Sequence, residues 1–167
     1  MMTMTRGWMA SAAVLACVAG GAVMARTGQA QTETARKDTR MTRATGTFDV
    51  KLTPQSTDES KMLGRMTIDK QFHGDLEGTS KGEMLTAGTD VKDSAGYVAI
   101  ERVSGKLQGR AGAFILQHTG TMNRGQPSLS VSVVPDSGTG ELKGLSGTMT
   151  IDIGGGKHAY VFEYTIK

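Results

Sequence analysis

The sequence predicts an all-β fold, an eight-stranded antiparallel barrel, and three observations support this prediction. Short segments alternate apolar and polar residues, as strands with one buried face do. Glycines punctuate these segments, most clearly over residues 97–125, and glycine supplies the positive φ that tight turns between strands require. No ten-residue amphipathic helix follows Met24. Many short strands without helices are typical of a barrel or sandwich.

The expected strands follow one another at regular spacing. In the first, Phe48, Val50 and Leu52 alternate with polar residues, and Pro54 is expected to end it. The second contains Met66, Ile68, Lys70 and Phe72 and follows a polar turn over residues 55–61. The third, around residues 82–86, has a weaker pattern. The other five are expected near residues 97–103, 113–119, 129–133, 149–153 and 160–166.

A four-residue pattern, polar–Leu–polar–Gly, recurs where one predicted strand passes to the next. It occurs at residues 75–78, 106–109 and 141–144, so its copies begin 31 and 35 residues apart. Because glycine at a bend lets a sheet coil on itself, the repeat is interpreted as one bend reused to close the barrel. The alternative is that Leu-x-Gly is simply common in a glycine-rich β protein.

The N-terminus has the layout of a secretory signal peptide over residues 1–30. Arg6 precedes an uncharged apolar run over residues 8–25, and Gly28-Gln29-Ala30 resembles a cleavage site. The mature protein is therefore expected to be extracytoplasmic, either periplasmic or secreted. Two alternatives keep it on a membrane. Val14-Leu15-Ala16-Cys17 resembles a bacterial lipobox that would be lipidated at Cys17, and an uncleaved run is near the length of a membrane span.

Residues 31–43 are polar, lack aromatic side chains and show no periodicity, so they are predicted to be a disordered linker before a barrel domain over residues 44–167. The chain has a net charge of +3, but the barrel domain itself is not basic, since residues 44–167 contain 13 basic and 14 acidic residues. A nucleic-acid-binding protein needs a concentrated positive surface, and aromatic residues make up only 5% of the chain. No nucleic-acid partner is expected.

Glu101 is the leading candidate site residue, because it shares a strand face with Tyr97 and Val103. If that face points into the barrel, burial raises the pKa of the carboxyl toward the range of a general acid or base. In the alternative, Glu101 pairs with Arg102 or with a lysine of a neighbouring strand at the rim. The two readings assign it opposite roles, functional in the first and structural in the second.

His118 lies on the same face of its predicted strand as Phe114 and Leu116, and this face can approach Glu101 in an antiparallel pair. A Glu–His pair could bind a polar group or move a proton. Alternatively, His118 ends a strand and is satisfied by the backbone. Tyr160 belongs to an aromatic stripe that is either core or ligand platform. The candidate pocket is therefore Glu101, His118, Tyr97, Phe114 and Tyr160.

Other chemistry finds little support. His73, His118 and His158 lack the short spacing of zinc motifs, so no metal is expected. Ser137 and Ser146 lie outside any Gly-x-Ser-x-Gly motif, and the three glycines at 154–156 open no helix that could hold a phosphate. No cofactor is expected, and Cys17 is the only cysteine, so a cleaved chain has no disulfide.

Four segments, residues 70–76, 96–101, 109–114 together with 117–118, and 133–142, resemble a bacterial family catalogued as domain of unknown function 3224. The resemblance extends in order over about residues 44–167. That family resembles the allene oxide cyclase barrel in fold, and residues 138–144 resemble the glycine-rich hairpin of allene oxide cyclases and dirigent proteins. The resemblance implies an eight-stranded antiparallel barrel and no reaction, because no set of catalytic residues of those plant proteins can be placed here residue by residue.

The sequence therefore predicts an exported barrel that binds a small apolar or amphipathic molecule in its interior. Two alternatives stay open: an isomerase or cyclase that uses Glu101 and His118, and a filled barrel that acts through its surface or by self-association. Barrels of eight strands have interiors that are either filled or just wide enough for one small ligand. A filled interior would argue against both the binding and the enzyme hypotheses.

Overall fold

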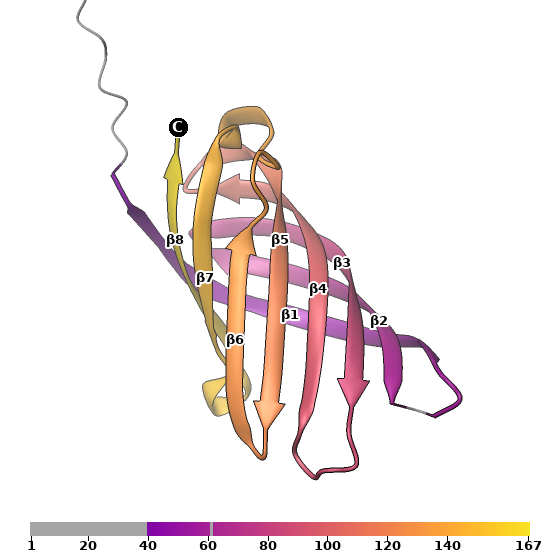
Figure 1. Cartoon of the computed structure of the whole chain (residues 1–167). Helices are drawn as coiled ribbons and strands as arrows, with labels where there is room; N and C mark the ends of the chain where they lie inside the picture. Colours follow the sequence, from indigo (N-terminus) through magenta and orange to yellow (C-terminus); the bar gives the residue numbers. More distant parts are fainter. Residues whose placement is uncertain (1–39, 61) are drawn as a thin grey trace, which may run out of the picture. The chain divides into compact units, whose positions relative to one another are not determined.

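The computed structural model describes residues 40–60 and 62–167, which form a closed antiparallel β-barrel (Figure 1). Each strand pairs with the next along the chain, and the last strand closes the barrel on the first. The strands are β1 (Thr42–Thr57), β2 (Leu63–Gly74), β3 (Leu76–Gly88), β4 (Ala95–Leu107), β5 (Arg110–Asn123), β6 (Gln126–Val133), β7 (Leu145–Asp152) and β8 (His158–Ile166). The predicted fold is confirmed, whereas the predicted signal peptide lies outside the described residues.

The first strand differs from its prediction at both ends. β1 begins at Thr42, where Thr42 and Arg43 already pair with β8, so it includes two residues assigned to the linker. It also continues past Pro54 to Thr57, and the prediction that Pro54 ends the strand was wrong. β1 pairs with β8 only as far as Phe48, and beyond this point its second edge has no strand partner within residues 40–60 and 62–167. A proline that lacks an N–H is tolerated at such an edge, and a register shift follows it.

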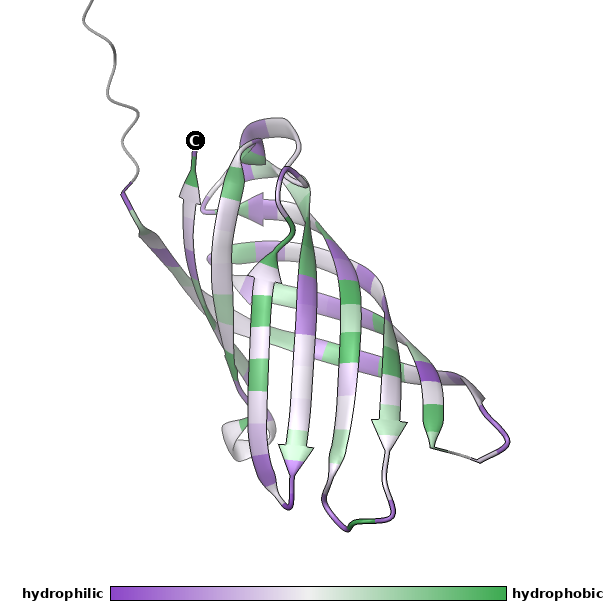
Figure 2. Cartoon of the chain, viewed as in Figure 1, coloured by the Kyte–Doolittle hydropathy of each residue, from purple (hydrophilic) through white to green (hydrophobic). Residues whose placement is uncertain are grey.

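The third strand is longer than its pattern predicted. β3 spans 13 residues, yet its inward-facing positions include Gly78, Ser80 and Gly82, which give little hydrophobic signal. Along β6 the alternation of hydrophobic and more polar residues is visible in Figure 2, in agreement with the sequence pattern of residues 129–133. Small inward residues on β3 have a structural consequence, because they leave room between the strands on either side.

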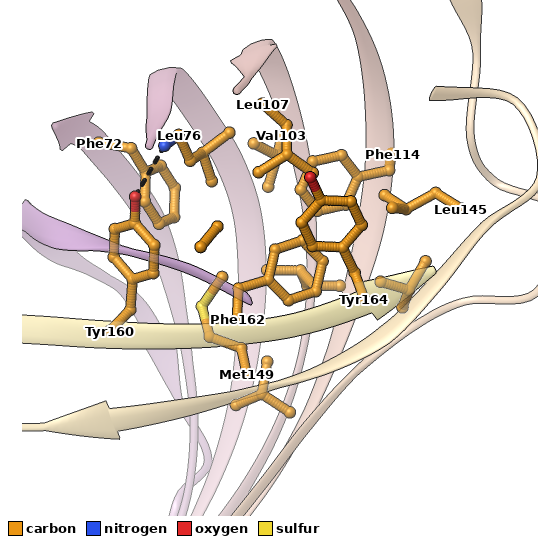
Figure 3. Close-up of a cluster of buried hydrophobic side chains, with 14 of the residues drawn as sticks. Phe72, Leu76, Val103, Leu107, Phe114, Leu145, Met149, Tyr160, Phe162 and Tyr164 are labelled. Carbon is orange, nitrogen blue, oxygen red and sulfur yellow. Dashed lines mark hydrogen bonds between the residues drawn. The ribbon is translucent and has the colours of Figure 1, made fainter. Parts of the chain in front are cut away.

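One end of the barrel is filled by a hydrophobic core. Phe162 of β8 lies between Phe114 and Tyr164, with ring centroids 5.7 Å and 5.3 Å from its own. Figure 3 shows these rings together with Leu76 and Leu107. The hydroxyl of Tyr160 accepts a hydrogen bond of 2.8 Å from the backbone N–H of Leu76 (Figure 3). This end of the barrel is therefore closed by side chains.

The repeated polar–Leu–polar–Gly segments meet at this closed end. Their leucines, Leu76, Leu107 and Leu142, are all fully buried in one core, and Leu76 pairs directly with Leu107 across β3 and β4. Gly109 and Gly144 have φ of 84° and 82°, a backbone conformation that other residues rarely adopt. The repeat thus places three leucines as a plug, with glycine turning the chain after two of them.

Candidate functional site

Two opposite charges are buried in the middle of the barrel. Lys70 on β2 and Glu101 on β4 approach with 2.7 Å between Nζ and Oε2, and their side chains are 6% and 0% exposed. β3 lies between these strands and presents Ser80 opposite Lys70 and Gly82 opposite Glu101. Because Gly82 has no side chain, the lysine and the glutamate can meet across it. The small residues of β3 therefore make the ion pair possible.

The ammonium of Lys70 is enclosed by aromatic rings as well as by the carboxylate. Its Nζ lies 4.7 Å from the ring centroid of Phe48 and 5.7 Å from that of Phe72. Both distances are within the range of a cation–π interaction, which strengthens as water is removed. The positive charge of Lys70 thus faces Glu101 and two aromatic rings.

His118 on β5 is the third ionisable group of this region. It is buried, and its Nε2 lies 3.5 Å from Oε2 of Glu101. Burial, the larger cause, and the charge of Lys70 together lower the pKa of His118 from 6.5 to about 4, while the charge of Glu101 opposes the change. The imidazole is therefore neutral at neutral pH. Its separation from Glu101 is too long for a strong hydrogen bond.

Several polar atoms here have no hydrogen-bond partner among the described residues. They are Ser80 Oγ, both carboxylate oxygens of Glu101 and Nε2 of His118, all fully shielded by protein. The 2.7 Å contact between Lys70 and Glu101 is a charge contact whose angles do not form an aligned hydrogen bond. We call these four residues, Lys70, Ser80, Glu101 and His118, the polar centre. Unpaired buried polar groups are costly, so they point to a role that compensates for this cost.

The end of the barrel opposite the leucine plug is open. A cavity of about 910 Å³ lies there, and we call it the mouth cavity. It is bounded by the β3–β4 and β5–β6 ends and by Ile153 next to the short helix η2 (Gly154–Gly156), which Figure 1 shows at this end. Apolar side chains dominate its wall; they include Met62, Leu63, Tyr97, Met122, Leu129 and Ile151.

Tyr97 connects the mouth cavity to the polar centre. It lines the cavity, and its ring lies over Gly120, where an added Cβ would come within 2.2 Å of the ring. Along β4, Tyr97 and Glu101 share the inward face, and along β5 His118 is the next inward residue after Gly120. Burial raises the pKa of the Tyr97 hydroxyl, and the negative charge of Glu101 raises it further. Tyr97 thus lies within electrostatic reach of the carboxylate.

The structure brings three of the five predicted site residues together and separates the other two. Glu101, His118 and Tyr97 lie along one path from the centre to the mouth cavity. Phe114 stacks on Phe162 in the core, and Tyr160 is bonded to the backbone at the closed end. Both are inward-facing, as expected, but they lie in the filled half of the barrel.

Sequence reasoning missed Lys70 as a site residue. It proposed Arg102 or a rim lysine as the partner of Glu101, but Arg102 is exposed and donates to Ser104, and the lysine that pairs with Glu101 is buried. A signal was present, since Lys70 has the same parity as the buried Ile68 and Phe72 on β2. A lysine on an apolar face needs a buried partner.

The three histidines of the chain have different surroundings. His73 lies on the outside, 3.1 Å from Asp49, and His158 stacks on Phe48. Within residues 40–60 and 62–167, no group of three or more His, Cys, Asp or Glu residues could hold a metal ion. Nor does any helix in that part of the chain have the length and apolar character to cross a membrane.

Fold and site together define a closed eight-stranded barrel with one filled end, one open end and a buried ionic centre between them. The chain belongs to the family described as "Protein of unknown function (DUF3224)", whose sequence profile matches residues 44–164. It is similar to a solved structure of a DUF3224 protein of unknown function from Shewanella oneidensis MR-1. That similarity has 55% identity and a TM-score of 0.73, and covers 77% of this chain and 98% of the other. No curated protein matches the chain.

Proposed function

We propose that this protein binds a small apolar or amphipathic molecule in the mouth cavity. The observation that carries the proposal is an apolar cavity of about 910 Å³ at the open end, with the polar centre beyond Tyr97. Its volume falls within the range of about 300–1,000 Å³ usual for small-molecule sites. An apolar wall with a few inward polar groups is also the composition usual for such sites.

The other two hypotheses have less support. A completely filled barrel does not fit the open end. An isomerase or cyclase needs a group that moves protons near neutral pH, but the charge of Glu101 is already paired with Lys70. His118, with a pKa of about 4, is a weak base. The arrangement favours holding a molecule over transforming it.

Titration with N-phenyl-1-naphthylamine, an apolar dye that fluoresces when it leaves water, tests the proposal. Leu129 lines the mouth cavity and is 40% exposed, whereas Leu85 is 58% exposed on the outer face of β3. Leu129→Gln should weaken dye binding about tenfold, as expected for the loss of one apolar contact of about 1.4 kcal/mol. Leu85→Gln is the matched control and should leave affinity unchanged. Equal effects of the two variants, or no saturable binding, would refute the proposal.

Native mass spectrometry of the protein purified from its own host would identify a natural ligand. A retained small molecule should add a defined mass to the intact chain. Leu129→Gln should reduce the fraction of chains that carry it, whereas Leu85→Gln should not. A natural ligand retained equally by both variants would place its site outside the mouth cavity.

We further propose that the chain is exported, on the basis of the layout of residues 1–30. N-terminal sequencing of the mature protein should then begin near Gln31. A mature N-terminus at a lipidated Cys17 would establish the lipoprotein alternative, and an intact Met1 on a membrane-bound chain would establish the uncleaved anchor.

A further inference from the structure

The polar centre holds one positive and one negative group, and the two differ in what surrounds them. Lys70 is the only buried cation of the described residues, and Glu101 together with the rings of Phe48 and Phe72 surrounds its ammonium. A bound molecule therefore finds no free positive charge in the barrel interior. The carboxylate of Glu101, in contrast, keeps Oε1 without any partner among the described residues.

The remaining groups of the centre are neutral. Ser80 Oγ has no partner within the described chain and can donate or accept a hydrogen bond. His118 is neutral, so its ring offers one donor and one acceptor. Tyr97 adds a hydroxyl at the border of the mouth cavity. The interior thus presents one under-bonded carboxylate and several amphoteric groups.

We infer that the site selects an amphipathic molecule with an uncharged head group that donates a hydrogen bond, such as an alcohol, over a carboxylate of equal chain length. This inference rests on the proposed function. Because the carboxylate oxygens of Glu101 are shielded by protein, a ligand hydroxyl in the mouth cavity can donate to Tyr97, which lines the cavity and lies within electrostatic reach of Glu101, and the hydroxyl carries little desolvation cost. A ligand carboxylate would bring a second negative charge toward Glu101 in a medium that screens charge poorly, and it would lose its own hydration without a free cation to pair with.

Competition between decan-1-ol and decanoate for the dye site tests the inference on the full, unaltered chain at pH 8, where decanoate is ionised. Decan-1-ol should displace the dye at a concentration at least about tenfold lower than decanoate. Equal or better displacement by decanoate would overturn the inference while leaving the proposed function standing. If the dye binds the mouth cavity and neither compound displaces it, the inference fails as well. Absence of dye binding is the separate result that refutes the proposed function.

An alcohol also enters any apolar cavity more readily than a carboxylate does, so a variant must show that the polar centre is the cause. Lys70→Met combined with Glu101→Gln removes both buried charges at once and should reduce the preference for decan-1-ol to about threefold or less. The control removes an exposed ion pair of similar type: Arg65 and Glu83 lie 2.7 Å apart on the outer face of β2 and β3. Arg65→Met with Glu83→Gln should keep the full preference.

A double variant of the centre that folds and retains the full preference would overturn the inference. If that variant does not fold, Tyr97→Phe replaces it, since this change removes only the hydroxyl at the border of the cavity. Tyr97→Phe should weaken displacement by decan-1-ol severalfold and leave displacement by decanoate unchanged. Equal effects on the two compounds, or none, would overturn the inference.

Discussion

Replacing Glu101 by Gln keeps the shape of the side chain and removes its charge, leaving the ammonium of Lys70 in the barrel interior without a counter-charge. Both side chains are almost completely buried and 2.7 Å apart. Breaking a buried pair of this kind costs about 3 kcal/mol or more, because the remaining charge is desolvated and unpaired. In a domain of this size a loss of about 3 kcal/mol lowers Tm by roughly 10–15 °C.

Urea unfolding followed by far-ultraviolet circular dichroism measures this free energy, and thermal melts measure Tm. Lys70→Met should be compared in the same assay, and the double variant of Lys70→Met with Glu101→Gln should recover most of the loss, since no charge is then left unpaired. Glu83→Gln in the exposed pair is the surface control and should leave the melt nearly unchanged. A Glu101→Gln variant as stable as the unaltered chain would refute the reasoning. It would show that Glu101 behaves as the isolated carboxylate that the sequence pattern first suggested.

Three further predictions concern single side chains. His118 binds a proton near pH 6.5 in the unfolded chain but only near pH 4 in the folded barrel. The free energy of unfolding should therefore be unaffected by this titration above pH 6.5 and should decrease as pH falls from 6.5 to about 4, by up to about 3 kcal/mol. Urea unfolding at several pH values should show this loss, and His118→Gln should abolish it. Gly120→Ala should lower the free energy of unfolding by about 1–3 kcal/mol, because the new Cβ collides with the ring of Tyr97. Urea unfolding measures this loss, which should vanish when Tyr97 is also replaced by Ala. Tyr160→Phe should cost about 1–3 kcal/mol in the same assay, because the buried N–H of Leu76 loses its acceptor; a neutral result would show that this bond contributes nothing net.

Strand parity predicted correctly which side chains face the interior, but it could not predict how far along the barrel each one lies. Glu101 and Phe114 both face inward, yet the first belongs to the polar centre and the second to the filled core. The distance along the axis depends on the register between strands, which the alternation of a single strand does not contain. For the same reason Tyr160 was grouped with Glu101, although it lies at the closed end.

The partner of Glu101 was missed for a related physical reason. Lys70 and Glu101 are on strands that are not neighbours, and they meet only because Gly82 leaves space between them. The third strand has a weak apolar alternation because several of its inward residues are small. Those small residues are what allow Lys70 and Glu101 to meet across it. A glycine within a strand can therefore indicate a close approach of the groups on either side.

The leucine plug has a consequence for how this barrel can change over generations. Most of the fully buried apolar side chains lie in the cluster that includes Leu76, Leu107 and Leu142, whereas residues of the opposite rim, such as Leu129 and Ile153, are substantially exposed. Substitutions at the rim therefore cost little folding free energy, while those at the plug cost much. Related proteins can therefore change residues of the rim, and with them the ligand preference of the mouth cavity, without first gaining stability elsewhere. The same division makes the rim the place to begin a directed-evolution library and the plug the part to hold constant.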